Sequence, residues 1–274
     1  MFEINNKLYE TITQDKIVET FSNLKIVFDP SWKKVGVNLS GGADSALLTF
    51  FICSIIEKHK LDCTVTAITY QRCWETRPWQ GYVSIQVYNW LKSRFPKIIT
   101  DRITNYIPPE LEHGAIGPIV NGRSGDQIIV GSFNRFAAWQ NNLNAVYNAT
   151  SKNPDANRAD RMTNRDKDAE DGVLEDVWRY GKKEDAYLAH PFRFVKKDWI
   201  VAQYFIYGID ELYYITRSCE GDIEQHEIIK RACGHFKDYK DGMDIPLCKQ
   251  CWWCEERQWA EDRLQETIRE IDRG

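Results

Sequence analysis

"VGVNLSGGADSALLTFF", residues 35 to 51, places a turn of small residues between two apolar segments. Residues 35 to 39 have the composition of a short buried strand, and the residues from Ala46 onward have that of a buried helix. Glycines in such a turn let backbone N–H groups approach an anion closely, and the helix N-terminus adds partial positive charge. This stretch therefore predicts a phosphate site between the strand and the helix.

The rest of the chain continues the alternation of strands and helices. Further strands are predicted at residues 63 to 70, 97 to 107 and 143 to 149. Helices are predicted at 81 to 95, from near Ser124, from about Lys197, and in a charged segment at 254 to 273. This order indicates an α/β fold with a mainly parallel sheet flanked by helices, in which ligands bind at the carboxyl ends of the strands.

Composition limits the classes of function. The chain has 274 residues, 43% of them hydrophobic, and a net charge of −4, which argues against a nucleic-acid partner. There is neither a signal peptide nor a membrane-spanning apolar run, so we expect a cytoplasmic protein without a membrane partner. Three regions are predicted, namely an N-terminal extension (1–34), an α/β domain (35–215) and a cysteine-rich region with a final helix (216–274).

The glycine turn matches one of three known phosphate-binding patterns. A Walker A loop needs a Lys after its last glycine, and the dinucleotide fingerprint needs G-x-G-x-x-G; neither is present. The remaining S-G-G-x-D-S pattern resembles the PP-loop of the N-type ATP pyrophosphatases, which cleave ATP between the α- and β-phosphates. That resemblance implies that ATP is bound by Ser40, Gly41, Gly42, Ala43, Asp44 and Ser45, with Asp44 helping to hold Mg²⁺. The simpler alternative is that Asp44 or Ser45 only caps a helix.

The C-terminal region carries a metal-binding pattern. "CKQCWWCEER" places Cys248, Cys251 and Cys254 as C-x-x-C-x-x-C, a spacing that lets thiolates converge on Zn²⁺. Zinc takes four ligands, and the candidates for the fourth are Cys219 first, then Cys233, then His226 or His235. Four protein ligands would make the zinc structural. A 4Fe–4S cluster and a set of buried thiols are the alternatives.

Several segments together resemble the 7-cyano-7-deazaguanine synthase family of the queuosine pathway. The strongest are "TRSC" at 216 to 219 and the cysteine segment, with Arg257 three residues after the last Cys and Ala260 three residues later. Weaker matches are "HPFRFVKKDW", with Pro191 and Lys197, "VNGRSGD", with Arg123, and "ITYQRC", with Gln71 and Arg72.

The resemblance implies an adenine nucleotide alpha hydrolase-like fold and a zinc-containing homodimer. It implies an ATP-dependent ligase that converts 7-carboxy-7-deazaguanine and ammonia to an amide and then a nitrile, releasing AMP and pyrophosphate. The implied catalytic residues are Asp44, Ser45, Arg123 and Lys197. From the residues alone, Arg123 is equally consistent with a surface ion pair and Lys197 with an exposed helix position.

The chain also departs from that family. Residues 220 to 247 separate Cys219 from the other cysteines, Ser124 replaces an Asn, Cys73 replaces a His, and the family's Y-P-D-C-R loop is not visible. Three other functions therefore remain open. They are a repurposed relative acting on another carboxylate, on a protein or a modified base; a PP-loop tRNA-thiolating enzyme; and a nucleotide-sensing module without turnover.

Overall fold

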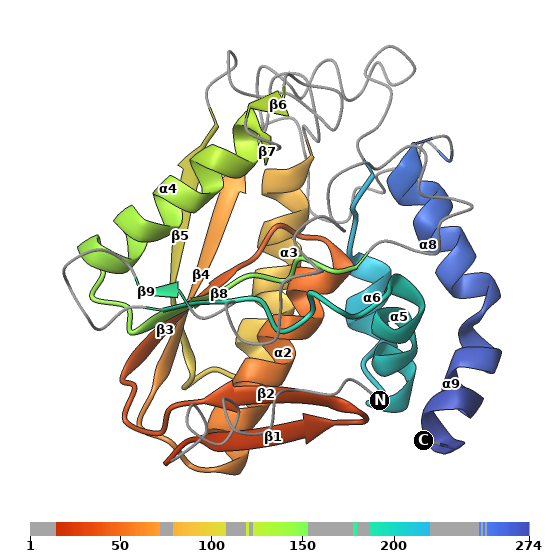
Figure 1. Ribbon diagram of the computed structural model, residues 1–274, viewed down its shortest axis with the longest axis horizontal. Coiled ribbons are helices and arrows are strands. Elements are labelled where there is room, and N and C mark those ends of the chain that lie inside the picture. Colours follow the sequence, from red (N-terminus) through yellow and green to blue (C-terminus); the bar gives the residue numbers. More distant parts are fainter. Residues whose placement is uncertain are drawn as a thin grey trace.

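The computed structural model describes residues 15–71, 79–107, 119–120, 123–152, 178–179, 187–219, 247, 249 and 251–273. Its centre is a sheet (Figure 1), in which the strand order is β5-β4-β3-β8-β10-β9. The first five of these strands run parallel, and β9 pairs antiparallel with β10 at the edge. The strands are β3 (Lys34–Asn38), β4 (Thr64–Gln71), β5 (Ile99–Tyr106), β8 (Ala145–Tyr147), β9 (Trp178–Arg179) and β10 (Tyr187–Ala189). The predicted α/β class is confirmed.

The order of connections marks one position at the sheet edge. From β3 the chain passes through α2 (Ala43–Lys58) to β4, and through α3 (Gln80–Arg94) to β5. It then returns through α4 (Gly125–Gln140) to β8, on the other side of β3. Successive strands are therefore added first on one side of β3 and then on the other, and a sheet of this kind binds ligands at such a switch point, outside the carboxyl ends of its strands. The glycine turn follows β3 directly.

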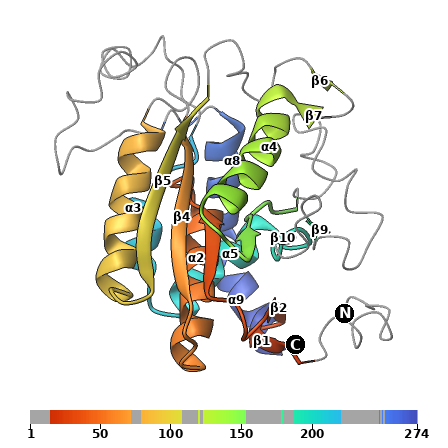
Figure 2. The ribbon, with the colours of Figure 1, turned by 90° about the vertical axis from the view of Figure 1, so that its left-hand side faces the viewer.

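Helices cover both faces of the sheet. Figure 2 shows α3 on one side of β4 and β5 and α4 on the other. The α2 and α3 layer also contains α5 (Lys197–Ile206) and α6 (Asp210–Ile215), and it encloses the larger core, to which Val35, Val37 and Phe51 belong. A smaller core under α4 contains Ile68, Tyr70 and Ala137. No helix in the described segments is long and apolar enough to cross a membrane.

A hairpin of β1 (Ile17–Phe21) and β2 (Leu24–Phe28) precedes the sheet. Phe21 and Phe28 belong to the main core, and the Phe21 ring stacks on Phe51 with 3.9 Å between ring centroids. The predicted boundary at residue 34 stays a prediction, but residues 17 to 28 share the core of the α/β domain.

The C-terminal segment folds back along the domain. Helices α8 (Trp252–Asp262) and α9 (Leu264–Arg273) both pack against α5. The sequence predicts one helix over residues 254 to 273, and the structure instead divides it at Arg263. The Arg263 side chain forms ion pairs with Asp198 at 3.1 Å and Glu266 at 3.3 Å, which tie the junction to α5 and α9. The helix predicted from near Ser124 begins at Gly125, after a short pairing of β6 (Ile119–Val120) with β7 (Arg123–Ser124).

Candidate nucleotide and metal site

The glycine turn and the first helical residues, 40 to 45, form a compact loop that we call the phosphate loop. Gly41 has a φ of +84°, and a Cβ placed there would lie 2.9 Å from the backbone nitrogen of Ser84. Both the conformation and the close approach to α3 therefore require glycine. Helix α2 begins at Ala43, three residues earlier than predicted, so Asp44 lies in its first turn. The N–H groups of a first turn have no partner within the helix, and an anion can accept hydrogen bonds from them.

Two serine hydroxyls brace this loop. Ser45 Oγ donates to the Gly42 carbonyl at 3.0 Å and accepts from the Ser40 N–H at 3.1 Å. Ser40 Oγ lies 3.1 Å from Ser45 Oγ and accepts from the Gly42 N–H at 3.3 Å. Gly42, the residue before the helix, has no side chain and therefore supplies no cap. The serines therefore stabilise the turn, rather than serving as a simple N-cap.

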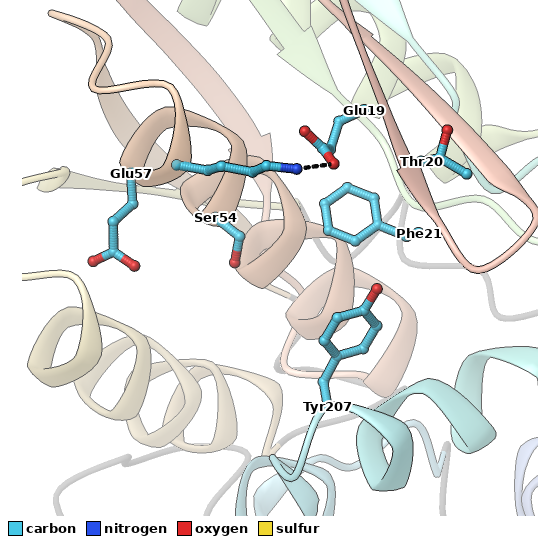
Figure 3. Close-up of a pocket in the computed structure, with 7 residues that line it drawn as sticks. Glu19, Thr20, Phe21, Ser54, Glu57 and Tyr207 are labelled. Carbon is cyan, nitrogen blue, oxygen red and sulfur yellow. Dashed lines mark hydrogen bonds and ion pairs between the residues drawn. The ribbon is translucent and has the colours of Figure 1, made fainter.

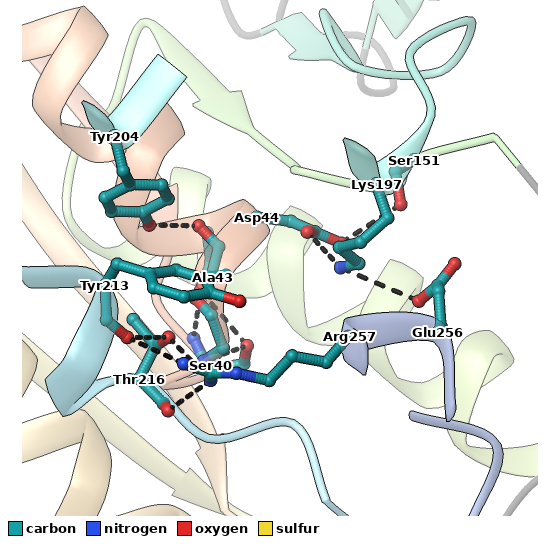
Figure 4. Close-up of polar contacts among 12 residues, drawn as sticks. Ser40, Ala43, Asp44, Ser151, Lys197, Tyr204, Tyr213, Thr216, Glu256 and Arg257 are labelled. Carbon is teal, nitrogen blue, oxygen red and sulfur yellow. Dashed lines mark hydrogen bonds and ion pairs between the residues drawn. The ribbon is translucent and has the colours of Figure 1, made fainter. Parts of the chain in front are cut away.

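Asp44 lies at the centre of a charged cluster (Figure 4). Its Oδ1 forms an ion pair with Lys197 Nζ, and its Oδ2 accepts a hydrogen bond from Ser151 Oγ at 3.0 Å. Lys197 Nζ also lies 3.7 Å from Glu256 Oε2, on α8. The side chain of Lys197 is only 5% exposed. Three distant parts of the chain thus meet at the carboxylate predicted to hold Mg²⁺.

The T-R-S-C segment packs directly on the phosphate loop. The Arg217 N–H donates to the Gly41 carbonyl at 2.9 Å. Ser218 Oγ lies so close to Gly42 that a Cβ there would be 2.7 Å away. Arg257 fixes the start of this segment, because its Nη1 donates to the Thr216 carbonyl at 2.8 Å. Two motifs that are far apart in the sequence therefore form one surface.

Tyrosines and an arginine support the loop from beneath. The Tyr204 hydroxyl donates to the Ala43 carbonyl (Figure 4). Burial, reinforced by the nearby Asp44 charge, raises the pKa of Tyr204 well above its usual value, so this hydroxyl keeps its proton. The Arg257 guanidinium lies 4.0 Å from the ring centroid of Tyr213, a cation–π contact.

Arg102, on β5, donates from Nη2 to Ser84 Oγ at 2.9 Å, next to the point where Gly41 meets α3. Burial lowers the pKa of the Arg102 guanidinium.

Three cysteines converge beside this site. The sulfur atoms of Cys219, Cys251 and Cys254 all lie within 4.8 Å of one another, and those of Cys219 and Cys251 are 3.9 Å apart. Tetrahedral zinc with Zn–S bonds of about 2.3 Å separates its sulfur ligands by about 3.8 Å, so this geometry fits zinc. The hydrogen bond with Cys219 favours the Cys254 thiolate, but the contact with Cys251 and burial outweigh it and raise the pKa of Cys254 to about 12.

A hollow of about 410 Å³ lies elsewhere, between the β1–β2 hairpin and α2 (Figure 3). Phe21 and Tyr207 line it together with two carboxylates. Glu19 already pairs with Lys58 at 2.7 Å, and Glu57 pairs with Arg94 at 2.9 Å. Both carboxylates therefore already have ion-pair partners within the chain. None of the residues that line this hollow belongs to the site that the sequence predicts.

The structure brings together most, but not all, of the predicted site residues. The phosphate loop, Lys197, and the cysteines 219, 251 and 254 lie in one region. Cys248, Cys233, His226 and His235 fall outside the described residues. Arg123 lies in β7, and its predicted catalytic role stays a prediction.

Sequence reasoning did not select Ser151, Tyr204 or Glu256 as site residues. No motif gives these three residues a role, and only folding brings them to the loop. Arg257 has a signal in the sequence, since it matches the Arg three residues after the last cysteine in the resembling family.

Comparisons with known proteins give distant similarities of fold. No protein-family model and no curated protein sequence matches the chain. The structure is similar to U34-tRNA thiolase NcsA from Methanococcus maripaludis with its 4Fe–4S cluster, at 10% identity and a TM-score of 0.44, covering 87% of this chain and 72% of that one. It is also similar to NAD⁺ synthetase from Burkholderia pseudomallei, at 12% identity and a TM-score of 0.36, covering 87% of this chain and 81% of that one. These similarities are too distant to assign the chain to either family.

Proposed function

We propose that the chain is an ATP-dependent C–N ligase of the PP-loop type, similar to 7-cyano-7-deazaguanine synthase. The supporting observation is the contact of the T-R-S-C segment with the phosphate loop, through Ser218 at Gly42 and Arg217 at Gly41. The two segments carry the strongest part of the sequence resemblance, and a phosphate site needs the backbone N–H groups and small residues found there. The site also lies at the switch point of a parallel sheet, where such folds bind ligands.

In this proposal the phosphate loop binds the β- and γ-phosphates of ATP. Backbone N–H groups of the first turn of α2 and the hydroxyls of Ser40 and Ser45 would face the departing pyrophosphate. Mg²⁺ would neutralise the phosphate charge, and Asp44 would hold it. The Lys197 ammonium already lies against this carboxylate, so the position suits a cation. Lys197 and Arg123 would supply positive charge to the nucleotide side.

The chemistry consists of two displacements at phosphorus, one displacement at carbon and a final elimination. A substrate carboxylate oxygen attacks the α-phosphorus, the bond to the β-phosphate oxygen breaks, and pyrophosphate leaves. Ammonia then attacks the acyl carbon, AMP leaves, and a base accepts the released proton, giving the amide. A second ATP activates the amide oxygen in the same way, and loss of AMP with two protons gives the nitrile. The protein contributes orientation and charge stabilisation, and needs no covalent nucleophile.

The cysteine cluster has a structural role in this proposal. Cys219, Cys251 and Cys254 would be zinc ligands, with Cys248 as the fourth, and the metal would join α8 to the T-R-S-C segment. Metal analysis of the purified chain tests this directly, with one zinc per chain as the expected result. A homodimer and a cytoplasmic location are further expectations of the same resemblance, and the mass of the particle in solution tests the first.

One experiment tests the activity. The purified chain is incubated with ATP, Mg²⁺, ammonia and a panel of carboxylates that includes 7-carboxy-7-deazaguanine, and the nucleotides are analysed by mass. We expect AMP and pyrophosphate in amounts that depend on one carboxylate, and no AMP from Asp44→Asn. Formation of ADP alone, or no nucleotide turnover with any carboxylate, contradicts the proposal. The carboxylate that releases AMP also distinguishes the deazaguanine substrate from that of a repurposed relative.

A tRNA-thiolating enzyme is the second candidate, because the cysteines lie next to the phosphate loop. Cys219 directly follows Ser218, so an iron–sulfur cluster on these thiols would border the nucleotide site. The net charge of −4 argues against a tRNA partner. A brown protein whose iron and sulfide match the cluster would favour this candidate, and a colourless zinc protein would rule it out.

A further inference from the structure

Lys197 contacts two carboxylates, and only one of them belongs to the phosphate loop. Its Nζ pairs directly with Asp44 and lies 3.7 Å from Glu256 Oε2 (Figure 4). The exposed fractions of the side chains are 5% for Lys197, 18% for Asp44 and 0% for Glu256. A carboxylate with no exposed surface is costly unless a cation lies close to it. The Lys197 ammonium is a cation of this kind beside Glu256.

The Lys197 ammonium lies close to both carboxylates, and the two differ in exposure. Asp44 is the more exposed of the two and also accepts a hydrogen bond from the Ser151 hydroxyl, so it is the carboxylate that a second cation can reach. A divalent ion there would repel the ammonium that now occupies the same oxygen.

We propose that Glu256 is a positioning residue that receives the Lys197 ammonium when a magnesium–nucleotide complex binds at Asp44. This inference rests on the proposed function. The ammonium moves from Asp44 to Glu256, so the ion pair is exchanged rather than broken. The lysine side chain, with its flexible four-carbon stem and three donors, suits such a short movement.

Glu256 is held by a rigid part of the chain, so Lys197 is the partner that moves. Arg257, the next residue, donates to the Thr216 carbonyl at 2.8 Å and stacks on Tyr213. Two residues before Glu256, Cys254 joins the thiol cluster. Helix α8 therefore presents Glu256 at a fixed position beside the phosphate loop.

The test measures how strongly Mg²⁺ tightens nucleotide binding. Calorimetry with α,β-methylene-ATP, with and without Mg²⁺, gives the magnesium-dependent gain in affinity for each variant. We expect Glu256→Gln to reduce this gain about tenfold relative to the unchanged chain, while affinity without Mg²⁺ changes less than about threefold, because Lys197 then has no second carboxylate to bind. Glu255→Gln is the matched control, since it removes the neighbouring exposed carboxylate of the same helix, and it should leave the gain unchanged.

The outcomes separate this inference from the function on which it rests. If the unchanged chain binds no nucleotide, the proposed function fails. If it binds with a magnesium-dependent gain that Glu256→Gln retains in full, or if that variant weakens binding equally with and without Mg²⁺, Glu256 is only structural and the inference is wrong. Glu256→Asp gives a second measurement if the glutamine variant does not fold. Glu256→Asp keeps the charge on a shorter side chain. Its magnesium-dependent gain in affinity should lie between that of the unchanged chain and that of Glu256→Gln.

Discussion

Replacing Lys197 by methionine tests the charged cluster through stability alone. Methionine has nearly the same shape, but it leaves Asp44 and Glu256 without the ammonium between them. Removing one partner of a buried ion pair typically costs about 3 to 5 kcal/mol, and the 5% exposure of Lys197 places it in that class. With an unfolding entropy of about 2.1 cal/mol/K per residue, the 274-residue chain should lose about 5 to 9 °C in Tm.

The measurement is thermal and urea unfolding followed by circular dichroism, without nucleotide or Mg²⁺. Asp44→Asn removes one of the two carboxylates beside the Lys197 ammonium. The free energy of unfolding of the double variant Lys197→Met with Asp44→Asn should therefore fall by about 1 to 3 kcal/mol less than the sum of the two single losses. A loss under about 1 kcal/mol for Lys197→Met, or strict additivity in the double variant, would refute the reasoning that these charges depend on one another.

Three further predictions concern the loop, the cysteines and the hairpin. Gly41→Ala places a side chain at φ +84° and 2.9 Å from a backbone nitrogen of α3, so we expect a loss of at least about 1 to 2 kcal/mol and much weaker ATP binding; normal binding would contradict this. Cys254→Ser should lower the zinc content by metal analysis and lower the Tm, and an unchanged metal content would exclude the cysteine site. Burial raises the pKa of the Asp29 carboxyl, but the contacts with Lys16 and Ser31 outweigh it, so the pKa lies below its usual 3.8. The stability that Asp29 contributes is therefore complete above about pH 4 and lost at lower pH, and the difference in unfolding free energy between the unchanged chain and Asp29→Asn should shrink there.

Local patterns predict the parts of the fold that local chemistry determines. The apolar run of residues 35 to 39, the small residues after it and the apolar helix beyond are a strand, a tight turn and a helix in the structure. The sequence predicts the first residue of α2 three positions too late, because the serines that brace the turn bond to residues on both sides of the boundary. The sequence predicts one final helix over residues 254 to 273, and the division at Arg263 comes with a contact to Asp198 of another helix.

The candidate site was predictable where a motif carries it. The S-G-G-x-D-S pattern and the cysteine spacing identify Asp44 and Cys254 without a structure. Glu256 carries no such signal, because a glutamate next to another glutamate in a charged helix is typical of a solvent-facing surface. Its burial depends on how α8 packs on α5, which only the tertiary structure determines.

Two segments of the chain link the cysteine cluster to the phosphate loop and the charged groups beside it. Cys219 follows Ser218, whose hydroxyl touches Gly42, and Cys254 lies two residues before Glu256, which faces the Lys197 ammonium. Holding the three thiols together therefore restrains two segments that contact the loop from different directions. A metal on these thiols would influence the nucleotide site through geometry alone, without redox chemistry. The proposed metal site and the charged cluster at Asp44 would then act as one functional unit.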